Sequence, residues 1–150
     1  MVDRAARDQF VELIRHLAAG QISNDEFEAR VPRSQNDPAI GAVFWNGAWL
    51  LYDDLRQYKL VGKCRLPKEA RREVARWVLF LKSDLEYEWP RLLGVYRFPG
   101  YVLNVITLGA MGWMIRTQLH RRGDASVWPF MRCSDYEAAL AKPPYLAGAL

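Results

Sequence analysis

The strongest constraint on the fold of this chain is one helix-forming stretch between Leu66 and Pro90, LPKEARREVARWVLFLKSDLEYEWP. Pro67 suits the first position of a helix, because it has no N–H to leave unpaired and its φ angle is already helical. At the other end, Pro90 disfavours helical geometry in Trp89, the residue before it. The stretch therefore predicts a helix over residues 67–89.

The predicted 67–89 helix has separate apolar and basic faces. At about 100° per residue the apolar side chains share one side, and they are Ala70, Val74, Trp77, Val78, Leu81 and Leu85. A basic stripe follows another side and consists of Arg65, Lys68, Arg72 and Arg76. Cations near the N-terminus of a helix oppose its dipole by a few tenths up to about 1 kcal/mol each. We therefore expect ion pairs, a metal or a partner to compensate the charges.

Three carboxylates fall on or beside the apolar faces of predicted helices: Asp54, Asp84 and Glu88. A buried carboxylate without a partner costs several kcal/mol, so the three predict an inward carboxylate cluster. Such a cluster could hold Mg²⁺ through carboxylates and water, or form a structural network with Arg, Trp and Tyr side chains. Neither His16 nor His120 has the Glu-x-x-His spacing of di-metal helical bundles. The structural network is the simpler interpretation, and the identity of any metal stays open.

Helix signals recur along the rest of the chain. Asp3 and Gly20 bound a predicted helix over 3–19, because aspartate caps helix starts and glycine ends helices. The run Ser23–Glu26 is a capping box that starts a second helix. Further helices are predicted at 38–59, which begins at Asp37-Pro38, at 101–121, and from Ser134, itself the first residue of another capping box.

These signals predict an all-α fold, a single-domain helical bundle of about five or six helices. Residues 1–31 would form a helical hairpin, 37–122 the core helices, and 123–150 a draped tail with one short helix. The tail contains an extended Trp-Pro-Phe segment at 128–130 whose aromatic rings we expect to pack on the bundle.

The predicted 101–121 helix is apolar on every side from Tyr101 to Ile115. A helix of this kind lies at the centre of a bundle, in a membrane or under a partner. Fifteen residues span roughly 22 Å, which is short of the ~30 Å hydrocarbon core. We expect a buried central helix, and a peripheral but not spanning membrane contact stays open.

Aromatic residues are concentrated where a solvent-facing helix side would not need them. Trp45, Trp49 and Tyr52 lie opposite the apolar face of the 38–59 helix, and Trp113 lies in the apolar helix that follows. Large aromatic side chains often anchor protein interfaces. The four predict a binding surface, and the leading interpretation is a non-catalytic protein-interaction or assembly protein, acting on a protein partner or on itself.

Composition and motifs disfavour several other function classes. The net charge of +4 is mildly basic and no groove-reading motif accompanies it, so a nucleic-acid partner is not expected. Cys64 and Cys133 have no metal or redox spacing, and no histidine is placed as a base for a nucleophile. The first ten residues lack the apolar core of a signal peptide. We therefore expect a cytoplasmic protein without a cofactor and, on balance, without enzymatic activity.

Two alternatives to the interaction protein remain. One is a metal-binding, hydrolase-like enzyme that uses Asp54, Asp84 and Glu88. The other is a peripheral membrane-associated helical protein attached through its 101–115 segment. The sequence contains no signal for a small-molecule ligand.

Parts of the sequence also resemble known proteins. Residues 18–31, AAGQISNDEFEARV, resemble a SHOCT-type helical hairpin, which implies at most a protein-contact or oligomerisation element. The longer pattern LYDDL, ARWVLFLKSDLEYEWP and VWPFMRCSDYEAAL resembles small uncharacterised bacterial helical proteins of unknown function. That likeness implies a soluble bacterial protein and brings no activity with it.

Overall fold

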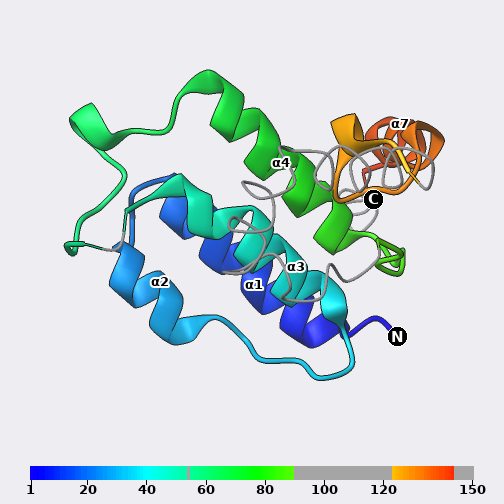
Figure 1. Ribbon diagram of the computed structural model, residues 1–150, viewed down its shortest axis with the longest axis horizontal. Coiled ribbons are helices and arrows are strands. Elements are labelled where there is room, and N and C mark those ends of the chain that lie inside the picture. Colours follow the sequence, from blue (N-terminus) through cyan, green and yellow to red (C-terminus); the bar gives the residue numbers. More distant parts are fainter. Residues whose placement is uncertain (54, 90–122, 144–150) are drawn as a thin grey trace, which may run out of the picture.

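The described part of the chain is built from helices and the loops that connect them. The computed structural model describes residues 1–53, 55–89 and 123–143. Within these ranges there are five α-helices and no β-strand (Figure 1). The helices are α1 (Arg4–Ala18), α2 (Asn24–Arg30), α3 (Pro38–Asn46), α4 (Lys68–Lys82) and α7 (Cys133–Ala141), with 3-10 turns η1 (Ala48–Leu51), η2 (Gly62–Cys64) and η4 (Ala125–Val127). The prediction of an all-α fold is confirmed.

Helices α1 and α2 form the predicted N-terminal hairpin. Asp3 caps α1 by accepting a hydrogen bond from the Ala6 amide, and Gly20 follows the helix with a φ of 70°, which favours glycine. The Ser23 hydroxyl and the Glu26 carboxylate make both bonds of the predicted capping box at the start of α2. Local side-chain chemistry thus determines where the first two helices begin.

Helix α1 lies between α2, α3 and α4 and carries much of the core (Figure 1). Its side chains Phe10, Ile14 and Leu17 are fully buried. Phe27 of α2 stacks on Phe10 with ring centroids 6.1 Å apart. Because α1 packs most extensively against α4, these two helices and the rings between them form the centre of the described fold.

The predicted 38–59 helix is wrong in its second half. The Asp37 cap and the Pro38 start are as expected, but α3 ends at Asn46 and η1 follows Gly47. Gly47 lies against the Trp77 indole, and its φ of −131° and ψ of −80° are not helical. After η1, the side-chain amide of Asn24 donates hydrogen bonds to the carbonyls of Asp53 and Arg56. These bonds hold the segment around residues 53–56 against the start of α2.

The predicted 67–89 helix is also too long, because α4 ends at Lys82 and Ser83 is extended. Arg4 donates to the carbonyls of Leu81, Lys82 and Ser83, and Arg7 donates to that of Ser83. These guanidinium groups satisfy carbonyls at the helix end that would otherwise need further helical turns or water. Tertiary contacts from α1 therefore end α4 before Pro90.

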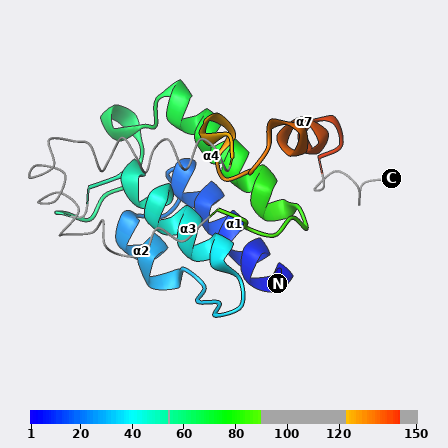
Figure 2. The ribbon, with the colours of Figure 1, turned by 45° about the vertical axis from the view of Figure 1, so that its right-hand side comes forward.

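The described part of the tail, residues 123–143, packs against α4 as predicted, but its Trp-Pro-Phe segment is not extended. The Phe130 amide donates to the Val127 carbonyl at 3.0 Å, which closes a turn at 127–130. Phe130 is fully buried and meets Phe80 edge to face at 5.1 Å. The Trp89 indole donates to the Phe130 carbonyl at 3.1 Å. Helix α7 lies beside α4, away from α2 and α3, in Figures 1 and 2.

Helix α7 differs slightly from the expected tail helix. It begins at Cys133, and Arg132 rather than Ser134 holds the cap position, with no side-chain cap. Glu137 instead accepts from the Cys133 thiol. The predicted helix at 101–121, including Trp113, lies outside the described residues.

Candidate interaction surface

The structure brings together three of the four predicted binding aromatics. Trp45 is the next-to-last residue of α3, Trp49 lies in η1, and Tyr52 follows η1 directly. The two indoles are 5.2 Å apart between ring centroids, and Trp49 meets Tyr52 at 5.9 Å. These rings therefore stay in one cluster even though the predicted helix breaks at Gly47.

The rings of this cluster pack directly on aromatic rings of the core. Phe44 meets Trp45 at 4.8 Å and Trp49 at 5.7 Å, both edge to face. Phe27, fully buried in α2, meets Phe44 at 6.0 Å and Tyr52 at 6.1 Å. Rings in such a series pack against one another, so the outer rings rest on rings that are buried in the core.

The outer end of this aromatic surface faces solvent. Trp45 remains 47% exposed and the neighbouring Leu50 of η1 is 75% exposed. Trp49 and Tyr52 are half-buried. Exposed apolar residues are ordinary when single, but a half-exposed indole that packs on the rings of Phe44 and Trp49 has the properties of an interface anchor. We use the name aromatic surface for Trp45, Trp49, Leu50 and Tyr52.

The predicted carboxylate cluster is wrong for Asp84 and Glu88. Because α4 ends at Lys82, neither residue lies on a helix face, and both are exposed. The Asp84 side chain is 92% exposed and pairs with Arg4 at 3.3 Å. Asp54, the third member, lies outside the described residues. In the described ranges no group of three or more His, Cys, Asp or Glu side chains is arranged to hold a metal ion.

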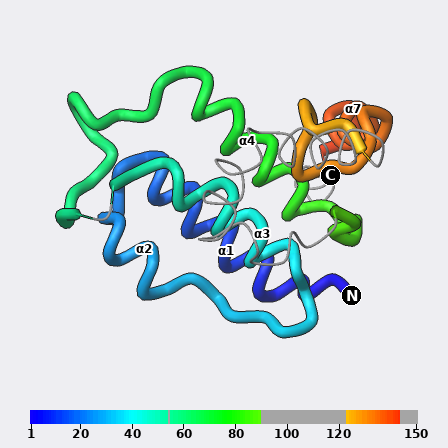
Figure 3. The backbone as a smooth tube through the Cα atoms, viewed as in Figure 1, coloured from blue at the N-terminus to red at the C-terminus, as the bar shows by residue number. Residues whose placement is uncertain are grey.

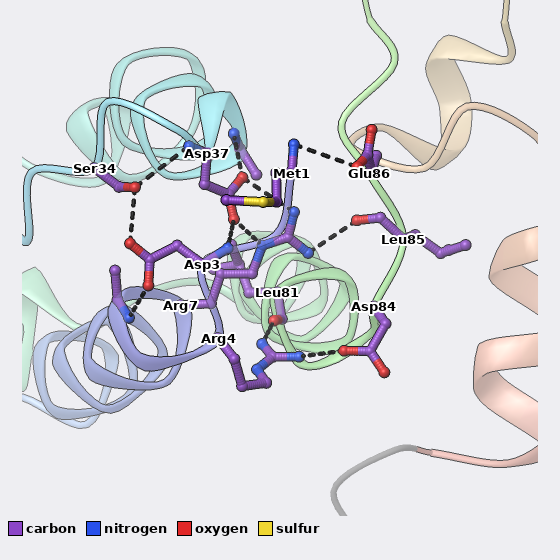
Figure 4. A network of polar contacts seen from close by, with 12 residues as sticks. Met1, Asp3, Arg4, Arg7, Ser34, Asp37, Leu81, Asp84, Leu85 and Glu86 are labelled. Atoms are coloured by element: carbon purple, nitrogen blue, oxygen red, sulfur yellow. Dashed lines mark hydrogen bonds and ion pairs between the residues drawn. The ribbon is translucent and has the colours of Figure 1, made fainter.

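Among the residues that the structure describes, the buried carboxylate is that of Asp37, which the sequence identified only as a helix cap. Its oxygens accept from the Arg7 guanidinium at 2.5 and 3.1 Å, from the Asp3 amide and from the Ala39 amide (Figure 4). Burial by itself raises the pKa of Asp37, but the hydrogen bonds and the Arg7 charge outweigh it and hold that pKa below its usual value. The group is therefore a charged structural anchor.

Sequence reasoning missed the partner Arg7, although a signal was present. Arg7 lies three, four and seven residues before Phe10, Val11 and Ile14, which places it on the apolar face of α1. A charged side chain on such a face needs an opposite charge nearby. Its guanidinium also lies over the Phe80 ring at 5.3 Å.

The predicted basic stripe divides into two parts. Arg76 donates to the carbonyls of Trp128 and Ser126 at 2.7 and 2.8 Å and pairs with Glu73, so it belongs to the fold. Arg65, Lys68 and Arg72 are exposed. Only the N-terminal part of the stripe is therefore available to a partner.

The two thiols do not have the features of a nucleophile. Cys64 and Cys133 are exposed and unbridged. The hydrogen bond to Glu137 raises the pKa of Cys133, with a smaller contribution from burial and from the carboxylate charge. A raised pKa reduces the thiolate fraction on which thiol reactivity depends.

Protein-family models, curated proteins and solved structures were compared with this chain, and none of them matches. Among the described helices, none combines the length and apolar character needed to cross a membrane.

Proposed function

We propose that the chain is a non-catalytic protein-interaction or assembly protein, and that the aromatic surface is its contact site. The observation that supports this proposal is the ring series from the buried Phe27 through Phe44 to the exposed Trp45. A partner that covers Trp45 gains its apolar area without paying to order the ring, because the core already holds it.

The chemistry of the surface suits a protein partner or a second copy of this chain. Tryptophan and tyrosine dominate the energetics of many interfaces, since they bury large apolar areas and keep one polar atom for a hydrogen bond. The adjacent Leu50, 75% exposed, would extend the apolar contact. The exposed free thiols Cys64 and Cys133 suit the reducing cytoplasm, which we include in the proposal.

The first test is the solution mass by light scattering on a sizing column, for the wild type and for Trp45→Glu. If the surface mediates self-association, we expect a concentration-dependent dimer that the variant lowers to a monomer. Leu140→Glu in α7 is the matched control, because Leu140 is 53% exposed and lies on another helix. It should leave the dimer intact.

If the wild type is a monomer, the next test is binding to a different protein. Affinity capture followed by measured binding of the purified partner should then show a loss of at least about tenfold for Trp45→Glu, because interface anchors are worth about 2 kcal/mol or more. Equal masses and equal partner affinities for Trp45→Glu and Leu140→Glu would contradict the proposal.

A further inference from the structure

A second surface carries cationic side chains that are not paired within the described fold. Five cationic side chains lie close together in sequence on η2, on the short link after it and on the first turns of α4, and we call them the basic face: Lys63, Arg65, Lys68, Arg71 and Arg72. All five are exposed. Within the described ranges, none of their side chains has a hydrogen bond or an ion pair. The face therefore presents its positive charge to solvent.

The arrangement of these charges is unfavourable for the isolated protein. Lys68, Arg71 and Arg72 are three and four residues apart, which puts them within one 100° arc of α4, and like charges at these spacings repel. They also lie at the positive end of the helix dipole. Glu69 is the one acid within residues 63–72, so five cations and one carboxylate leave this stretch at +4, and Glu73 pairs with Arg76. A polyanion that covered the face would remove both penalties.

Exposed apolar side chains accompany the basic face. Val61 directly precedes η2 and is 53% exposed, and Leu55, in the same connection between α3 and α4, is 90% exposed. The connection runs along the margin of the molecule, outside the packed helices, in Figures 1 and 3. The cations and the exposed apolar side chains thus lie on this connection and on the first turns of the helix that follows it.

This combination favours an anionic lipid surface over other polyanions. Nucleic-acid phosphates would engage the cations but offer nothing to Val61 and Leu55. An acidic peptide usually binds along a groove or a strand edge, whereas this face consists of a projecting loop and the outer side of one helix. A membrane interface takes up apolar side chains at the headgroup boundary while its anionic lipids attract nearby lysines and arginines.

We propose that the segment from Val61 to Arg72 attaches the protein peripherally to a membrane surface that contains anionic lipids. The five cations would lie at the headgroup phosphates and carboxylates, and Val61 would enter the boundary between headgroups and acyl chains. This contact is independent of the aromatic surface, so either could exist without the other.

The test is flotation of the full chain with phosphatidylcholine vesicles, with and without phosphatidylserine, at low ionic strength. We expect binding only to the phosphatidylserine vesicles, and we expect salt to weaken it because it screens exposed charges. Each basic residue near an anionic surface is worth about 1 kcal/mol, or about fivefold in partitioning. Arg71→Gln with Arg72→Gln should therefore lower the partition coefficient about 30-fold.

A matched control separates the basic face from net charge. Arg30→Gln with Arg33→Gln removes the same two charges from exposed positions at the end of α2 and in the loop after it, and should bind as the wild type does. Val61→Ser, which leaves the charge unchanged, should also weaken binding. Circular dichroism would verify that each variant is folded.

Three results would overturn the proposal. The first is equal binding to neutral and anionic vesicles, or no binding to either. The second is an equal loss for the two double variants. The third is tighter binding to a duplex oligonucleotide or to polyglutamate than to phosphatidylserine vesicles at the same ionic strength, which would assign the face to a nucleic acid or to an acidic protein.

Discussion

The buried guanidinium of Arg7 donates two hydrogen bonds to the carboxylate of Asp37, from Nε to Oδ2 at 2.5 Å and from Nη2 to Oδ1 at 3.1 Å. The remaining nitrogen of Arg7 donates to the carbonyls of Ser83 and Leu85 at 3.0 and 2.9 Å. One side chain of α1 therefore joins the start of α3 to the segment that follows α4 (Figure 4).

Removing Arg7 should strongly destabilise the protein. Arg7→Ala leaves the Asp37 carboxylate buried without its cation, and breaking a buried pair from one side costs about 3–5 kcal/mol. The free energy of unfolding, measured by urea titration, should fall by that amount. Arg30→Ala, at an exposed position, should change it by less than about 0.5 kcal/mol. Similar losses for both variants would contradict the anchoring role of Arg7.

The same pair should make stability depend on acid pH. The folded pKa of Asp37 lies below its usual value, so its stabilisation is complete above the unfolded pKa of about 4 and is lost as the pH falls through the folded pKa. The pKa of Glu26 is also lowered, chiefly by the hydrogen bond from the Ser23 backbone amide, so its contribution to stability is likewise lost as the pH falls.

Urea titrations of the wild type and Asp37→Asn across this acid range would isolate the Asp37 contribution. Asparagine keeps the cap of α3, while it removes the titrating group and retains the Glu26 contribution. The difference in unfolding free energy between the two proteins should shrink as the pH falls below about 4. A difference that stays constant with pH would show that Asp37 does not titrate differently in the folded state.

Arg76 and Arg72 should differ sharply although they are one helical turn apart. Arg76→Ala removes two charged hydrogen bonds to the tail carbonyls of Trp128 and Ser126, and hydrogen bonds to charged groups contribute about 1.5–3 kcal/mol. Arg72→Ala removes an exposed side chain with no bonding partner among the described residues. The melting temperature and the free energy of unfolding should both be clearly lower for Arg76→Ala than for Arg72→Ala. Equal stability would mean that Arg76 does not attach the tail.

Two glycines in and after α3 should respond to alanine with opposite signs. A Cβ at Gly41 meets nothing within 4 Å, so Gly41→Ala should stabilise the helix by about 0.5–1 kcal/mol. A Cβ at Gly47 would lie 2.8 Å from the Val43 carbonyl oxygen and 2.9 Å from Cζ2 of Trp77. Gly47→Ala should therefore destabilise by about 1–3 kcal/mol. Melting temperatures shifted in the same direction would contradict this packing.

The helix starts were predictable because their signals are local. Asp3, Ser23 and Asp37 each bond an amide two or three residues further along the chain, so the residues that make the cap are adjacent in the sequence. The tail contact of Phe130 was also predicted, since a Trp-Pro-Phe segment has few alternatives to packing on a core. Trp45, Trp49 and Tyr52 were expected on one side of a continuous helix, and their rings are neighbours although the helix breaks at Gly47.

The carboxylates show where local reasoning failed. A helical wheel placed Asp84 and Glu88 beside an apolar face only because the helix was extended to Pro90. The actual end of α4 depends on Arg4 and Arg7 of α1, which lie more than 70 residues earlier in the sequence and donate hydrogen bonds to carbonyls at the end of α4. No residue within one helical turn of Lys82 is a helix-ending signal that would have predicted those contacts.

The sequence by itself determined the helical class, the starts of α1, α2 and α3 and the apolar face of α1, because these depend on side-chain periodicity and on bonds that span one helical turn. The tertiary structure decided where α3 and α4 end, that Asp37 rather than Asp84 is the buried acid, and which arginines of α4 remain exposed. Each of these outcomes depends on hydrogen bonds or packing between residues distant in the chain. Such contacts are selected by how whole helices fit together, and a local pattern of residues does not contain that information.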